Sequence, residues 1–237
     1  MKILAPINSL QEVSLLIERG AQEIYCGVQP PNLKAKNTNS FVNKRITTEA
    51  SIENLEVLEK VINEAHAEEV KVFLTLNQPT YRPGLFSKIL ELAKETVDLG
   101  IDALIIGDPG LMSLVKKRIP EAVIHVSSLA GVLNSASIKF FRELGASRII
   151  FPRYISLEVL KAIISKIHPP LEYEVFILND GCVYEESYCH INHAFGGAFC
   201  KKNWAYSLEE TNLRQKPEKG ECFNHHKADY QYWLLHG

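Results

Sequence analysis

Residues 98–108 read DLGIDALIIGD, and the same arrangement recurs as ERGAQEIYCGV at residues 18–28 and as ELGASRIIFPR at residues 143–153. Each stretch closes a segment of helical period on a glycine and enters a short apolar run two to three residues later. A helix that ends on glycine and leads directly into a strand is typical of a repeated βα module. The three copies therefore predict an α/β protein built on a parallel sheet.

The rest of the chain up to residue 180 follows the same alternation. Short runs rich in Val, Ile, Leu and Phe, read as apolar on both faces, alternate with segments of helical period. Their number exceeds the usual count for a flavodoxin-like sheet, so we expect a (β/α)8 TIM-like barrel that is incomplete or irregularly closed; an open doubly wound sheet is the alternative. The expected strands are 2–7, 23–28, 71–77, 103–108, 123–128, 148–154 and 172–179, and the expected helices are 9–19, 51–69, 85–99, 110–119, 134–144 and 156–167.

Several of the expected helices start at residues that commonly cap helix amino termini. A side-chain oxygen at this position accepts a hydrogen bond from a backbone N–H that has no partner within the helix. The expected caps are Ser9, Ser51, Asn134 and Ser156.

The composition fits one globular domain. The chain has 237 residues, of which 46% are apolar and 23% are charged, a balance that excludes disordered and fibrous classes. No apolar run approaches the roughly 20 residues that span a bilayer, and the start MKILAPINS lacks the pattern of an export signal, so we expect neither secretion nor membrane insertion. The formal charge of −2 argues against strong general nucleic-acid binding but is compatible with a local basic patch.

Two stretches depart from the βα alternation. The connection over residues 29–48 is long and polar, so we expect it to lie over the carboxyl-end mouth of the barrel. Residues 201–221 are mostly polar and cannot fold around a hydrophobic core by themselves. We therefore expect a βα barrel over residues 1–180 and a cysteine-rich extension over residues 181–237 that packs on the mouth and needs another anchor.

Four cysteines fall in the last quarter of the chain, spaced Cys182-x6-Cys189-x10-Cys200-x21-Cys222. Without an export signal they are expected to be cytoplasmic thiols rather than disulfides. Four thiolates suit an iron–sulfur cluster or a tetrahedral zinc ion, and the wide spacing favours the cluster because zinc sites usually take ligands in close pairs. The alternatives are unrelated buried cysteines, or a nearby histidine in place of one ligand. Cys26, alone inside an apolar strand, is expected in the core.

The stretch EYEVFILNDGCVYEESYCHI, at residues 172–191, resembles the collagenase-like U32 peptidase family. The family signature runs Glu-x-Phe, then a cysteine after a short gap and a second cysteine seven residues later, and Glu174, Phe176, Cys182 and Cys189 match it. The stretches ILAPINSLQEVSLLIERGAQEIYCGV and VKVFLTLN resemble the family equally, so the similarity covers nearly all of residues 3–200. The chain departs from the pattern where the family usually has small residues before the first of these cysteines and a Ser-Gly-rich approach to the second.

The resemblance implies a barrel-like fold and, as in many members, a [4Fe–4S] cluster held here by Cys182, Cys189, Cys200 and Cys222. It also implies oxygen-independent hydroxylation, because well-understood members act on a ubiquinone precursor or on a pyrimidine of tRNA or ribosomal RNA, with prephenate proposed as the hydroxyl source in some. We therefore expect redox modification of a small-molecule or RNA-borne substrate. A related protein partner is compatible with this expectation.

Three polar residues at expected strand ends are candidates for catalysis: Arg153, Asp108 and His125. Arg153 would bind an anionic group such as a carboxylate or a phosphate. Asp108 has a structural alternative, because it can simply cap the following helix. His125 alternates with apolar neighbours, so its side chain faces either the barrel interior or the surrounding helices.

Asn77, Ser127 and Asn179 are the candidates for substrate binding at the same end of the strands. Asn77 can instead stabilise a turn, and Ser127 can instead bond the backbone. Two other functions remain open. If the cysteines were free, Cys182 with a histidine would suit a thiol- or metal-dependent peptidase. A non-catalytic, cluster-bearing partner subunit would lack the open polar mouth that an enzyme needs.

Overall fold

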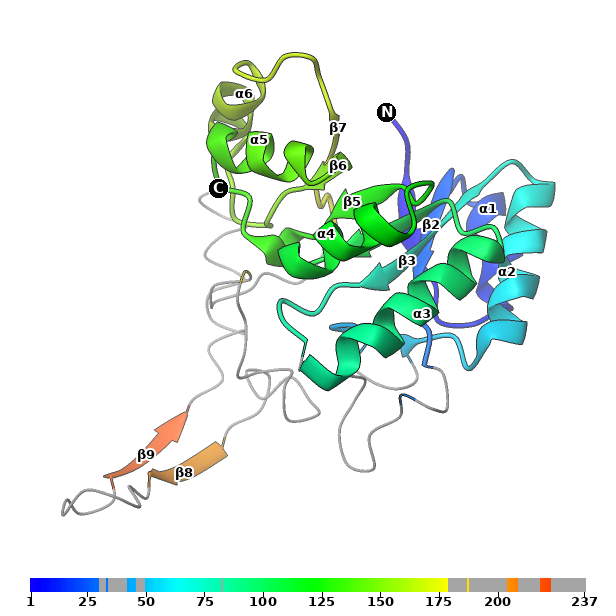
Figure 1. The fold of residues 1–237 in the computed structure, drawn as a ribbon, viewed down its shortest axis with the longest axis horizontal. Coiled ribbons are helices and arrows are strands. Elements are labelled where there is room, and N and C mark those ends of the chain that lie inside the picture. The colour runs from blue at the N-terminus through cyan, green and yellow to red at the C-terminus, as the bar shows by residue number, and fades with distance from the viewer. Residues whose placement is uncertain are drawn as a thin grey trace.

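The computed structural model describes residues 1–29, 33, 42–45, 50–81, 83–178, 187, 204–208 and 218–222. Within these ranges parallel strands alternate with α-helices (Figure 1), which confirms the expected TIM-like α/β fold. The strands of the main sheet are β1 (Leu4–Pro6), β2 (Glu23–Cys26), β3 (Lys71–Leu76), β4 (Ala103–Ile106), β5 (Ile124–Val126), β6 (Ala146–Ile150) and β7 (Glu172–Glu174). The helices are α1 (Glu12–Glu18), α2 (Leu55–Ala67), α3 (Phe86–Asp98), α4 (Pro109–Arg118), α5 (Ser135–Glu143) and α6 (Leu157–Ile164).

The main sheet is a curled half-barrel. Its seven strands pair in chain order from β1 to β7, and each neighbouring pair is parallel. Arg148 on β6 donates to Glu23 on β2 at 2.7 Å, although strands β3 to β5 lie between them in the sheet. A flat sheet would separate these strands by roughly 19 Å, at about 4.8 Å per strand. The sheet must therefore curl, while no pairing among the described residues joins β7 to β1.

Amphipathic helices cover the outer face of the sheet. α2 buries Leu58, Val61, Ile62 and Ala65, which recur at the spacing of one helical face. Figure 1 shows α1, α2 and α3 along one side of the molecule, and α5 and α6 together on the other side. The buried side chains of these helices and the outward side chains of the strands form the main hydrophobic core.

A second, smaller core fills the inside of the curled sheet. Inward side chains alternate with outward ones along each strand, so only every other residue reaches this space. The buried members are Phe73, Ala103, Ile105 and Ile150, and the partly buried members packed against them are Leu4, Tyr25 and Phe176.

Two of the four expected helix caps are confirmed. Asn134 accepts from Ser137 N at 2.9 Å, and Ser156 accepts from Val159 N at 3.4 Å. The prediction for Ser9 was wrong, because α1 begins at Glu12. The Glu12 carboxylate folds back to accept from the backbone N–H of Asn8 at 2.6 Å, which stabilises this start without a capping serine.

The prediction for Ser51 was also wrong, because the next residue, Ile52, pairs with the chain that follows β2. Ile52 forms a parallel bridge with Val28, and its backbone N–H donates to the carbonyl of Gly27 at 2.7 Å. This pairing prolongs the line of β2 and delays the helix. α2 begins at Leu55 and is capped by Asn54, which accepts from Val57 N at 2.9 Å.

A hairpin of the backbone lies within the cysteine-rich region. β8 (Trp204–Leu208) pairs antiparallel with β9 (Glu218–Cys222), and the register sets Trp204 opposite Cys222. The expected domain boundary near residue 180 falls outside the described residues. In the described part of the chain, no helix is both long enough and apolar enough to cross a membrane.

Candidate functional site

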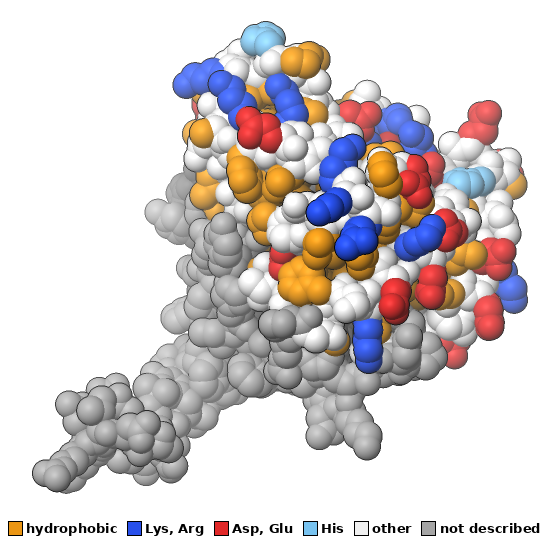
Figure 2. Space-filling view, viewed as in Figure 1, with side chains coloured by type: hydrophobic (Ala, Val, Ile, Leu, Met, Phe, Trp, Pro, Cys, Tyr) orange, Lys and Arg blue, Asp and Glu red, His pale blue; other side chains and the backbone are white. Residues whose placement is uncertain are grey.

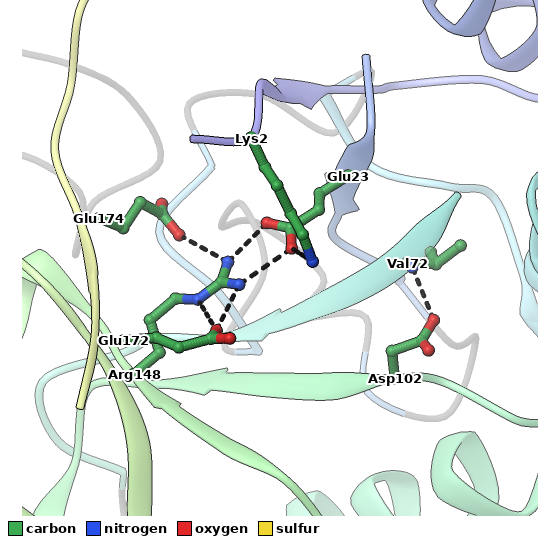
Figure 3. A network of polar contacts seen from close by, with 7 residues as sticks. All are labelled: Lys2, Glu23, Val72, Asp102, Arg148, Glu172 and Glu174. Atoms are coloured by element: carbon green, nitrogen blue, oxygen red, sulfur yellow. Dashed lines mark hydrogen bonds and ion pairs between the residues drawn. The ribbon is translucent and has the colours of Figure 1, made fainter. Parts of the chain in front are cut away.

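A buried arginine organises the inside of the half-barrel. Arg148 is 7% exposed, and its guanidinium donates to Glu23 at 2.7 and 2.9 Å, to Glu172 at 2.6 Å and to Glu174 at 3.3 Å (Figure 3). The Lys2 ammonium adds a contact of 3.2 Å to Glu23. We call these five residues the interior ionic cluster.

Glu23, Glu172 and Lys2 of the cluster lie near the amino ends of the strands, whereas Arg148 is in the middle of β6 and Glu174 is the last residue of β7. Glu23 is the first residue of β2, Glu172 is the first residue of β7, and the register sets Arg148 beside Glu172. In barrels this end of the strands usually serves stability, whereas the carboxyl ends carry catalysis. The cluster therefore stabilises the curled sheet, because it joins β2 to β6 and β7 across the interior.

Burial and pairing shift the pKa values of the cluster in different directions. Burial alone would raise the pKa of Glu23, but the hydrogen bonds and charges of Arg148 and Lys2 outweigh it and hold that pKa below its ordinary value. Burial raises the pKa of Glu174 to about 7, although the charge of Arg148 opposes the rise. Burial alone would lower the pKa of Arg148, but the hydrogen bonds and charges of Glu23 and Glu172 outweigh it and raise that pKa. The proton that titrates near neutral pH is therefore the one on Glu174.

His125 faces the inside of the half-barrel. Its ring lies 4.6 Å from the Phe73 ring, centroid to centroid, in an edge-to-face arrangement. Burial, reinforced by the charge of Arg148, lowers the pKa of His125 to about 3. Among the described residues no group hydrogen-bonds its Nδ1 atom. His125 is therefore a neutral ring at physiological pH, and its catalytic role stays a prediction.

The Glu-x-Phe motif has a clear structural meaning. Glu174 and Phe176 are two residues apart, so in extended chain both side chains point to the same face. Glu174 contacts Arg148, while Phe176 packs against the inner core. The guanidinium carbon of Arg153 lies 4.5 Å from the centroid of the Phe176 ring, within the range of a cation–π contact. The motif thus contacts two arginines: Glu174 contacts the buried Arg148, and Phe176 contacts Arg153.

Arg153 is an exposed residue in the connection between β6 and α6. This connection leaves the carboxyl end of β6, where the mouth of a barrel lies. The Phe176 ring packs against one side of the Arg153 guanidinium. A guanidinium at this place is suited to binding an anionic group, and this role of Arg153 stays a prediction.

Asp108 and Ser127 form the local contacts that were their structural alternatives. Asp108 Oδ1 accepts from Leu111 N at 3.0 Å and caps α4. Ser127 Oγ accepts from Leu129 N at 3.3 Å and begins a short 3₁₀ turn. Both are buried at strand ends, so their roles in catalysis and substrate binding stay predictions.

Asn77 holds part of the long connection that follows β2. Its Oδ1 accepts from the backbone N–H of Lys44 at 2.9 Å, and the hydroxyl of Tyr81 donates to the carbonyl of Val42 at 2.8 Å. Residues 42–45 therefore lie at the carboxyl end of β3, which agrees with the expected position of this connection over the mouth. Asn77 is occupied by this contact, and its direct binding of substrate stays a prediction.

Arg45 ties the same connection to β1 and β2. It donates through Nη2 to the carbonyl of Ile7 at 3.0 Å and to Asn8 Oδ1 at 2.6 Å, and through Nε to the carbonyl of Ala50. Its guanidinium carbon also lies 5.3 Å from the centroid of the Tyr25 ring. Arg45 is thus a structural clamp at the mouth, a role that its place in a polar connection does not reveal.

Three of the four predicted cluster ligands lie outside the described part of the chain. Cys182, Cys189 and Cys200, together with the predicted binding residue Asn179, lie outside the described residues. Cys222 belongs to β9, which the structure describes as backbone. Cys26 is fully buried, which confirms its predicted place in the core, and burial raises the pKa of its thiol to about 12.

The interior ionic cluster was missed because the strands were read as apolar on both faces. That reading was wrong for β2, β6 and β7. A signal was present, since Glu23, Arg148, Glu172 and Glu174 are charged residues within or at the start of apolar strands. A charge buried inside a barrel has to find an opposite partner, which sequence spacing alone does not identify.

The chain is similar to a known protein family and to two RNA-modifying proteins. A family model described as "Peptidase family U32" matches residues 8–235. The tRNA hydroxylation protein P of Escherichia coli is 33% identical over 188 residues, which cover 79% of this chain and 38% of that protein. The 23S rRNA 5-hydroxycytidine synthase of Escherichia coli is 25% identical over 227 residues, covering 96% of this chain and 32% of that protein. The chain spans less than half the length of these two relatives.

A solved structure of a U32 peptidase has the same fold. It superposes with a TM-score of 0.53 at 15% sequence identity, covering 74% of this chain and 67% of that one. The low identity limits this likeness to the fold, in agreement with the curled parallel sheet.

Proposed function

This chain belongs to peptidase family U32, and on that premise we propose that it takes part in the oxygen-independent hydroxylation of a pyrimidine base in RNA, or in a related redox modification of such a base. Two relatives support the proposal, since one is a tRNA hydroxylation protein and the other a synthase of 5-hydroxycytidine in 23S rRNA. The chain spans only part of each relative, so the activity of those whole proteins comes to it as a proposal.

The observation that carries the proposal is the contact of Arg153 with Phe176 at the mouth. An RNA-borne substrate brings phosphates and flat bases to the site. A guanidinium binds phosphate or carboxylate oxygens, and an aromatic ring offers a face on which a base can stack. In the proposed site, Arg153 binds the anionic group and Phe176 orients the guanidinium of Arg153.

The four late cysteines are a suitable donor set for a [4Fe–4S] cluster. The register of the β8–β9 hairpin sets Cys222 opposite Trp204, which follows Cys200 by four residues. Four residues span at most about 14 Å. The hairpin therefore allows a much shorter distance between Cys200 and Cys222 than an extended chain of 21 intervening residues would give. This supports Cys222 as the fourth ligand beside Cys182, Cys189 and Cys200. When bound, such a cluster would supply electron transfer.

The proposal is tested by nucleoside mass spectrometry. Transfer RNA and ribosomal RNA are digested from the host, from a strain that lacks the gene, and from that strain carrying either the wild-type gene or Arg153→Ala. We expect a hydroxylated pyrimidine to disappear in the deletion strain and to return with the wild-type gene but not with Arg153→Ala. Lys60→Ala, an exposed change on α2, is the matched control and should restore the nucleoside.

An identical set of modified nucleosides in the deletion and wild-type strains would contradict the proposal. Cleavage of gelatin or short peptides by the anaerobically purified protein would instead favour the thiol- or metal-dependent peptidase. The two assays separate these functions, because a hydrolase leaves the nucleosides unchanged.

A further inference from the structure

Charge is divided unevenly between two parts of the barrel wall. Residues 51–108, which contain α2 and α3, carry eleven acidic and five basic side chains, for a net charge of −6. Residues 109–168, which contain α4, α5 and α6, carry three acidic and nine basic side chains, for a net charge of +6. The near-neutral total thus conceals two segments of opposite net charge.

Seven of the nine basic residues lie on the helical wall, the others being Arg148 in the interior and Arg153 at the mouth. The wall residues come from α4, α5, α6 and the turn after α6. Among the described residues, none of the seven forms an ion pair with a carboxylate, whereas Lys2 and Lys94 both do. We call this group the basic wall; it consists of Lys116, Lys117, Arg118, Lys139, Arg142, Lys161 and Lys166.

Two sets of contacts join the helices that carry the basic wall. A Cβ atom added to Gly145, which follows α5, would lie 2.8 Å from Lys116 Cδ, so the Lys116 stem lies directly on this turn. Arg142 on α5 donates to the carbonyl of His168 at 3.1 Å and to that of Pro169. The carboxyl ends of α4 and α5 and the segment after α6 therefore lie side by side at the amino end of the barrel.

Figure 2 shows how the charged side chains are distributed on one face of the molecule. Blue side chains gather over α4, α5 and α6, and red side chains gather mainly over α2 and the neighbouring part of α3. The acidic residues within the basic segment are Glu121, Glu143 and Glu158, too few to neutralise the wall. Phe140, 49% exposed beside Lys139 on α5, adds an aromatic ring to the same surface.

We propose that the basic wall of α4, α5 and α6 binds the phosphate backbone of the RNA whose base reaches the mouth. The inference rests on the proposed function and adds the surface that would hold the RNA body. Lysine and arginine side chains that neutralise phosphates release bound counterions, which gives most of the affinity of such contacts. The acidic wall of α2 and α3 repels the same backbone, so the charge division orients the RNA as well as attracting it.

Two triple variants of the full chain test this surface. The first is Lys116→Glu, Lys117→Glu and Arg118→Glu, in the last turn of α4. The second, Lys60→Glu, Lys88→Glu and Lys94→Glu on α2 and α3, makes the same change in net charge on the other wall. All six side chains are exposed, and thermal unfolding checks that both variants are folded.

Binding is measured by fluorescence anisotropy with transcribed tRNA at several salt concentrations. We expect the α4 variant to bind at least tenfold more weakly and to reduce the slope of log affinity against log salt by about two to three, from roughly 0.7–0.9 per lost phosphate contact. The α2–α3 variant should change the affinity less than threefold.

Equal losses in the two variants would overturn the inference, because net charge rather than location would then set the affinity. Unchanged tRNA binding by the α4 variant would overturn the inference as well. In either case a nucleoside that still depends on Arg153 would leave the proposed function standing. If the wild-type chain bound no RNA and altered no nucleoside, both would fall together.

Discussion

The guanidinium carbon of Arg153 lies 4.5 Å from the centroid of the Phe176 ring, so the connection after β6 and the chain after β7 meet at the mouth of the half-barrel. Phe176 also packs against the inner core. A side chain that packs against the core therefore contacts a side chain that is exposed, an arrangement by which a scaffold can orient a cation.

Replacement of Phe176 by leucine should loosen Arg153 without removing it. The leucine keeps much of the apolar volume but offers no ring face to the guanidinium. We expect weaker substrate binding, with KM raised several-fold and kcat changed less. Steady-state kinetics with the RNA substrate measure both constants. A fall in kcat alone would show that Phe176 acts otherwise than by positioning Arg153.

Arg148→Met should be among the most destabilising single changes in the barrel. It leaves Glu23 buried with only the half-exposed Lys2 as a partner. Removing one member of a buried pair costs about 3–5 kcal/mol, and urea unfolding measures the loss. Glu172→Gln is the matched control, because that side chain is 62% exposed and should cost less than about 1 kcal/mol. Similar losses in the two variants would argue against a buried network.

Glu174 should make the protein less stable as the pH rises toward neutrality. Its folded pKa, about 7, lies above the ordinary value of 4.5, so the folded protein retains a proton that the unfolded chain releases between these values. The stabilisation is complete below about pH 4.5 and is lost as the pH rises through 7. In Glu174→Gln this contribution, up to about 3 kcal/mol, should be absent. The difference between wild type and variant in urea unfolding should therefore depend on pH; a constant difference would contradict the assignment.

His125 should make the protein less stable as the pH falls, which is the opposite of the effect of Glu174. Its folded pKa, about 3, lies below the ordinary value of 6.5, so the unfolded chain binds a proton that the folded protein does not. Stability is therefore complete above about pH 6.5 and is lost as the pH falls toward 3. His125→Phe keeps the aromatic contact with Phe73 and removes the titration, so the variant should lose less stability than wild type between pH 7 and pH 5. Circular dichroism during urea unfolding at the two pH values measures this.

The cysteines should hold iron and sulfide in the anaerobically isolated protein, near four of each per chain if the cluster is [4Fe–4S]. Alanine at Cys182, Cys189, Cys200 or Cys222 should remove most of both. Cys26→Ala is the control and should retain them, because that thiol is buried in β2. Iron and acid-labile sulfide assays decide the point, and stoichiometric zinc without sulfide would replace the cluster with the alternative metal.

Local sequence determined much of this protein. The strand and helix order could be predicted because hydrophobic period, caps such as Asn134, and left-handed glycines such as Gly20 and Gly145 act within a few residues of chain. The position of Arg153 after a strand followed from the same order. The Glu-x-Phe motif was visible in the sequence, although what its two side chains contact was not.

Only the tertiary structure decided which charges face inward and what they meet. Arg148 and Glu23 are 125 residues apart in the chain, and they meet because the sheet curls, which no local pattern encodes. Tertiary pairing also joins Ile52 to Val28 in place of a first helical turn, and the packing of successive helices places Lys116 of α4 against the turn after α5. Spacing along a strand fixes which residues share a face, but curvature fixes which face is the inside and which strands confront one another across it.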